Sequence, residues 1–149
     1  MDSLVFYFDV NVGKRLPEAI CLLRPKKVSN VYHHNTNRKL LGLPVGRHKS
    51  LFKDGEYDDV WLSFVGDKNW IVFTQDEKFH KAGYETELSA IKQFNIGCFY
   101  MWGACALPSE KALVLLKAMD AVIKAIELTP RPFIYKITKQ GKLISINIP

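Results

Sequence analysis

The stretch LVFYFD, residues 4–9, decides the fold, because an unbroken apolar run ends abruptly in an acidic residue. Four of its five apolar residues are β-branched or aromatic, which favours a strand buried on both faces. A second run, WIVFT at residues 70–74, is followed closely by Asp76. Strands of this kind belong to a parallel sheet, whose carboxyl ends share one edge where ligands bind.

Apolar periodicity predicts helices and further strands around these two runs. We expect Asn11 to cap a first helix, which has an apolar face from Leu16 to Leu23 and ends before Pro25. Two final strands flank Gln140-Gly141, a hairpin signal. The other predicted elements are strands at 28–32 and 96–101 and helices beginning at Asp58, over 87–94 and over 109–127. Because strands and helices alternate over the first hundred residues, the sheet should be mostly parallel.

The length of 149 residues fits one domain, residues 1–149, with a C-terminal hairpin region at 130–149. Residues 33–57 lack periodicity and carry a basic excess, which predicts a long basic loop. Three cysteines without paired spacing predict free thiols in a reducing cytoplasm. We expect no membrane association, since no apolar stretch approaches the length of a span.

The acidic residues next to these elements indicate a metal site. Asp9 and Asp76 follow buried strands, while Asp58 and Asp59 begin an amphipathic helix. Carboxylates gathered at one edge repel one another unless a cation lies between them. Hard oxygen ligands of this kind suit Mg²⁺ or Mn²⁺. Each residue also has a simpler interpretation, since acidic residues are common in turns and in the first turn of a helix.

Basic residues near the carboxylates suggest a polyanionic ligand. The net charge is +6, and Lys14 and Lys78 lie close in sequence to the acidic positions, where they could contact a phosphate. The basic loop could follow a nucleic-acid backbone, although a solvated loop explains it equally well. His33 and His34 are adjacent, and no further ligands at zinc spacing accompany them.

Three blocks of the chain together resemble the PIN-like domains related to VapC-type toxin ribonucleases. The first is FDVNV at 8–12, the second runs from DDVW at 58–61 through WIVFTQDEKF at 70–79, and the third is PFIYKIT at 132–138 with Gly141. The resemblance implies a three-layer α/β/α fold with a mostly parallel sheet and a C-terminal β-hairpin. It also implies an Mg²⁺- or Mn²⁺-dependent endoribonuclease that is held in check by an antitoxin.

Carried onto this sequence, the resemblance makes Asp9, Asp58 and Asp76 the metal ligands, with Asp59 as the alternate for the middle position. Asn11 could orient a ligand or a water molecule. Val10 replaces the acidic residue often seen after the first Asp, and Glu77 is the nearest candidate for a fourth acidic ligand. RNA and an antitoxin are the expected partners, and homodimer formation stays open.

Two other functions compete with the ribonuclease. Strand residues followed by Asp9-Val10-Asn11 imitate a haloacid-dehalogenase-like phosphatase, but Asn11 stands where that superfamily has a second Asp. The chain could also be a non-catalytic module that binds nucleic acid or protein through its basic loop.

Overall fold

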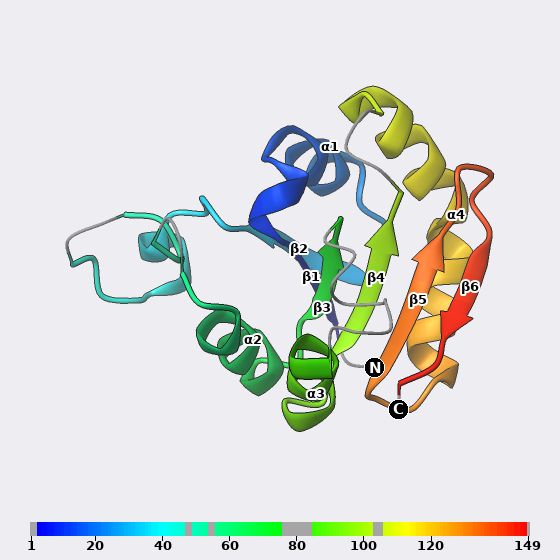
Figure 1. Cartoon of the computed structure of the whole chain (residues 1–149). Helices are drawn as coiled ribbons and strands as arrows, with labels where there is room; N and C mark the ends of the chain where they lie inside the picture. Colours follow the sequence, from blue (N-terminus) through cyan, green and yellow to red (C-terminus); the bar gives the residue numbers. More distant parts are fainter. Residues whose placement is uncertain (1–2, 47–48, 54–55, 76–84, 103–105, 149) are drawn as a thin grey trace.

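A six-stranded sheet organises the part of the chain that the computed structural model describes, residues 3–46, 49–53, 56–75, 85–102 and 106–148 (Figure 1). The strand order is β2-β1-β3-β4-β5-β6, and all neighbours are parallel except β5 and β6. The strands are β1 (Leu4–Phe8), β2 (Val28–His33), β3 (Ile71–Thr74), β4 (Gly97–Met101), β5 (Phe133–Ile137) and β6 (Leu143–Ile146). The mostly parallel sheet and the C-terminal hairpin are thus confirmed.

Helices cover both faces of the sheet, which gives the expected three-layer α/β/α arrangement (Figure 1). One face carries α1 (Arg15–Leu23) and α4 (Pro108–Leu128). The other carries α2 (Asp58–Asp67) and α3 (Glu85–Gln93). Two short 3₁₀ helices, η1 (Val10–Val12) and η2 (Arg38–Leu41), lie outside these layers.

The alternation of side chains along β1 explains why it lies inside the sheet. Phe6 and Phe8 pack with α1 and α4, whereas Tyr7 packs with α2 and α3. All three side chains are fully buried. A strand that is apolar on both faces needs a neighbour on each side and a helix layer on each face.

The chain reverses direction across the sheet at β1. From β1 it passes through α1 on one face to β2, and it then returns through α2 on the other face to β3. The carboxyl ends of β1 and β3 therefore border the point where the strand order reverses. In open α/β sheets, ligands bind in the crevice at this point.

The predicted basic loop contains residues that anchor it to the protein. The Arg38 guanidinium donates to the carbonyls of Pro44, at 2.8 Å, and Leu51, at 2.7 Å. Leu51 and Phe52 are buried against α2. At least one of its basic side chains thus holds the segment in place.

The prediction that Asn11 caps the first helix is wrong. Asn11 lies within η1, and α1 begins only at Arg15. Gly13 separates the two helices with a φ of +79°, a left-handed conformation that glycine adopts without strain. Asp9 caps η1, where its carboxylate accepts the N–H of Val10, and α1 follows Lys14 without a side-chain cap.

Candidate metal centre

Asp9 lies at the carboxyl end of β1 with a side chain only 5% exposed. Its Oδ1 accepts the backbone N–H of Val10 at 2.7 Å, and its Oδ2 accepts the hydroxyl of Thr74 at 3.2 Å. Burial of a carboxylate is costly unless such partners compensate for the lost water. The two bonds also fix the orientation of the carboxylate at the carboxyl ends of β1 and β3.

The turn after β1 is fastened to the end of β3. The Asn11 side-chain carbonyl accepts the N–H of Gln75 at 3.2 Å, and the Asn11 backbone carbonyl accepts from the Gln75 side chain at 2.7 Å. The backbone N–H of Asp9 donates to the carbonyl of Phe73 at 2.9 Å. These bonds hold the ends of β1 and β3 in a fixed relation, and Asn11 is a residue that links them.

The charge of Asp9 acts on two buried neighbours. Burial raises the pKa of the Tyr7 phenol well above its ordinary value, and the Asp9 carboxylate raises it further. The same two causes, in the same order, raise the pKa of the Cys98 thiol. Tyr7 and Cys98 both pack on the α2–α3 face of the sheet.

Of the adjacent pair that begins α2, Asp58 is the one turned toward the protein. Its Oδ1 accepts the indole N–H of Trp61 at 3.1 Å, and the Trp61 ring lies 5.6 Å from the Tyr7 ring. Asp59 is exposed. Asp58 therefore lies on the same face of the sheet as Tyr7, which favours it over Asp59 as the inward residue.

The described residues do not form a complete metal site by themselves. Within them, no group of three or more Asp, Glu, His or Cys side chains is placed to hold a metal ion. Asp76, Glu77 and Lys78, all named from the sequence, lie outside the described residues. What the described part offers is the Asp9 carboxylate, and carboxylate oxygen is a donor that suits Mg²⁺ or Mn²⁺.

Lys14 lies near the same edge, directly before α1. Its side chain is exposed, and its charge is one of the causes that lower the pKa of His33, at the end of β2. Burial is the main cause of that shift, Glu18 opposes it, and His34 and Lys14 add to it.

Two residues near this edge are not predicted from the sequence. Thr74 is fully buried and binds Asp9 directly. Lys111 is a buried cation in the first turn of α4, which begins after β4. The sequence held a signal for the lysine, since Lys111 precedes Leu115 by one helical turn and continues the apolar stripe of α4.

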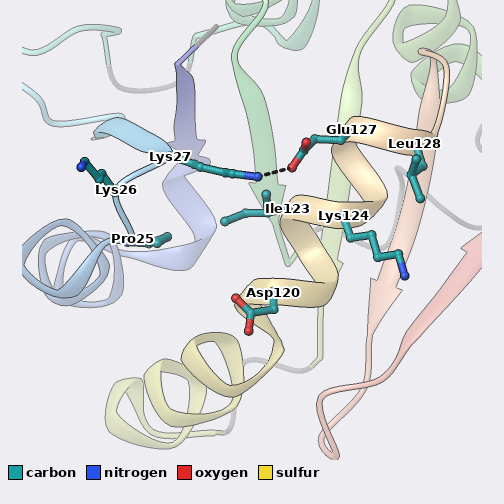
Figure 2. A pocket seen from close by; sticks show the side chains of 8 residues that line it. All are labelled: Pro25, Lys26, Lys27, Asp120, Ile123, Lys124, Glu127 and Leu128. Carbon is teal, nitrogen blue, oxygen red and sulfur yellow. Dashed lines mark hydrogen bonds and ion pairs between the residues drawn. The ribbon is translucent and has the colours of Figure 1, made fainter. Parts of the chain in front are cut away.

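A hollow of about 510 Å³ lies far from Asp9, at the amino-terminal edge of the sheet (Figure 2). It lies between the turn before β2 and the end of α4, and Lys27 and Glu127 form an ion pair of 3.0 Å across it. Its other charged residues are exposed lysines and Asp120. The predicted site residues are all absent from its lining.

A family model described as a PIN like domain matches residues 4–103, from β1 to just beyond β4. The chain belongs to the PIN-like domain family. No curated protein and no solved structure matches the chain.

The family match covers the first two sequence blocks and all four aspartates named from the sequence as metal ligands. The match ends before α4, so it does not reach the third block at 132–141. PIN-like domains are often nucleases, and the fold is of the nuclease type. Among the described helices, none is both long and apolar enough to cross a membrane.

Proposed function

We propose that this PIN-like chain is an Mg²⁺- or Mn²⁺-dependent endoribonuclease and the toxin of a toxin–antitoxin pair. The observation that carries the proposal is the buried Asp9 carboxylate, which is fixed by two hydrogen bonds at the reversal point of a parallel sheet. A buried carboxylate that is held in one orientation at this point of the sheet is a candidate functional group.

The metal ligands in this proposal are Asp9, Asp58 and Asp76, with Asp59 as the alternate to Asp58. An ionised carboxylate has about four lone-pair sites, so it can bind a metal ion while it also accepts hydrogen bonds. When bound, the ion would activate a water molecule and neutralise charge on the phosphate. Thr74 and the Val10 N–H keep the Asp9 carboxylate oriented. Lys14 and Lys78 are proposed to contact the RNA phosphates.

The decisive experiment compares wild type with Asp9→Asn. The amide keeps the size of the side chain but loses the charge that a divalent cation requires. We expect Mn²⁺ binding, measured by calorimetric titration, and RNA cleavage in Mg²⁺ or Mn²⁺ to be lost, while the circular dichroism spectrum stays unchanged. EDTA should abolish cleavage by the wild type. Cleavage by folded Asp9→Asn at the wild-type rate would refute the proposed site.

A matched pair on α2 tests the second ligand. Asp58 and Asp67 are the first and last residues of the same helix, and Asp67 is exposed at its far end. Asp58→Asn should impair cleavage, and Asp67→Asn should not. The toxin role has its own test, because growth arrest on expression should disappear with Asp9→Asn.

The non-catalytic module stays as the second candidate function. It draws on the basic excess of residues 33–57, which could contact nucleic acid or a partner protein. RNA binding that neither needs Mn²⁺ nor changes on Asp9→Asn, with no cleavage, would identify the chain as such a module.

A further inference from the structure

A pocket of about 550 Å³ lies beside the outer strand β2, between α1 and the turn that follows β2. No comparison and no step of the proposed mechanism assigns a role to it. Its polar lining residues include Glu18, Asn30, His33, Asn35 and Asn37. All of the lining residues are described in the structure.

The polar lining offers hydrogen-bonding groups that the protein does not use internally. The side-chain amides of Asn30 and Asn35 make no hydrogen bond to another described residue. His33 accepts the backbone N–H of Asn35 at its Nδ1, at 3.1 Å, so the proton of the neutral ring is on Nε2. The Glu18 carboxylate adds an acceptor. Donors and acceptors are thus both available.

Apolar side chains complete the pocket. Pro17 and Val31 are buried in its wall, and Leu40 is 76% exposed at η2. An apolar wall with mixed donors and acceptors around it suits a flat heterocycle that hydrogen-bonds along its edge. Unpaired RNA bases are recognised in this way, by packing on their faces and hydrogen bonds to their edges.

The pocket lies close to the candidate metal centre. In the β1–β2 register, His33 is the partner of Phe8, which directly precedes Asp9. Adjacent strands are about 4.8 Å apart and rise about 3.3 Å per residue. Asp9 therefore lies one strand across from His33 and one residue further along. Lys14, which directly precedes α1, is the basic residue that we propose for the phosphate of this strand.

We infer that the pocket beside β2 binds one unpaired nucleobase of the RNA strand whose phosphate lies at Asp9. The choice of RNA as the ligand rests on the proposed function. The pocket itself is independent of the metal ligands, since Asp9, Asp58 and Asp59 are absent from its lining. Base binding can therefore be measured without metal and without cleavage.

The test is an NMR titration of the ¹⁵N-labelled full chain in EDTA. The probes are the four nucleoside 5′-monophosphates, and ribose 5-phosphate is the control that lacks a base. We expect the side-chain amide signals of Asn30 and Asn35 to shift with at least one nucleotide and not with ribose 5-phosphate. Shifts that are absent, or equal for the sugar phosphate, would overturn the inference.

Variants locate the binding. Asn30→Ala should weaken nucleotide binding about 2- to 10-fold, the effect of one lost hydrogen bond. Asn147→Ala is the matched control, since Asn147 is also exposed but follows β6 at the opposite edge of the sheet. Equal effects of the two variants would contradict a base site beside β2.

The two proposals fail separately. RNA cleavage by the wild type without base-dependent shifts would leave the nuclease standing and refute the base pocket. Base-dependent shifts without any cleavage in Mn²⁺ would support the base pocket and refute the nuclease.

Discussion

Asp9 has two roles that involve the same carboxylate. It caps η1 through the N–H of Val10, and it carries a buried negative charge at the crevice. Capping explains why an acidic or small polar residue follows β1, but it does not require burial of the charge, since caps work as well at the surface. We therefore test Thr74, the hydrogen-bond partner of Asp9 from β3, as closely as Asp9 itself.

Removal of the Thr74 hydroxyl should weaken the metal site without touching a ligand. In Thr74→Val the side chain keeps its shape, but Asp9 loses a donor that orients it. We expect Mn²⁺ affinity, measured by calorimetric titration, to fall about 10- to 100-fold, as for other residues that orient a ligand. Thr74→Ser keeps the hydroxyl and should bind Mn²⁺ nearly as wild type does. Equal affinity in all three proteins would show that the bond does not orient a ligand.

His33 should make stability depend on pH. Burial is the main cause that lowers its pKa from 6.5, so the His33 ring takes up a proton less readily in the folded protein than in the unfolded chain. The unfolded state then binds more protons, and the free energy of unfolding rises with pH. We expect stability to fall as the pH drops through about 6.5 and below, and His33→Gln to lose that part of the slope. Urea unfolding between about pH 7 and pH 5 measures it, and an unchanged slope in the variant would contradict this role.

At the scale of the element, α2 is positioned by a close contact with the end of α3. A Cβ atom built on Gly66 would lie 2.6 Å from the backbone carbonyl oxygen of Phe94 and 3.0 Å from the Ile96 side chain. The backbone atom cannot turn aside as a side chain would. The absence of a side chain at Gly66 thus sets how closely α2 approaches the segment before β4.

Gly66→Ala should therefore destabilise the protein, although alanine favours a helix by up to about 1 kcal/mol over glycine. Forced overpacking of this kind costs about 1–3 kcal/mol, so the clash outweighs the propensity. Urea unfolding gives the comparison, with Ser63→Ala on the exposed side of the same helix as control. A higher free energy of unfolding for Gly66→Ala would mean that α2 can move away from Phe94 at no energetic cost.

The elements that the sequence predicted well are those whose pattern follows burial. Periodicity is plain in the apolar runs at 4–8 and 70–74 and in the apolar stripe of α4. The structure has β1, β3 and α4 at these places. The start of α1 was predicted wrongly, because Gly13 and the 3₁₀ turn before it leave no apolar period. The Asp9–Thr74 bond could not be foreseen either, since it depends on which strands become neighbours.

At the scale of the whole molecule, one sheet supports both helix layers. Phe73 of β3 is fully buried in the α1–α4 face and lies in a row of aromatic rings, 4.7 Å from Phe8 and 5.2 Å from Phe99. Its strand also carries Val72 on the opposite face. Damage to one layer is therefore transmitted to the strand that supports the other.

Phe73→Ala should lower the free energy of unfolding by about 3–5 kcal/mol, the usual cost of a large aromatic side chain lost from a core. Because both layers share β3, we expect fluorescence and circular dichroism to report one common unfolding transition. Phe73→Leu fills more of the space and should lose less. Separate transitions for the two probes would show that the layers unfold independently.

The place of β1 in the strand order also has a consequence for synthesis on the ribosome. Of the six described strands β1 is made first, yet it lies between β2 and β3, and β3 ends only at Thr74. At the usual rate of translation, roughly 2 to 8 seconds pass between the end of β2 and the end of β3. During that interval one hydrogen-bonding edge of a very apolar strand has no partner, a condition that invites aggregation. Only when β3 pairs with β1 are both hydrogen-bonding edges of that strand covered.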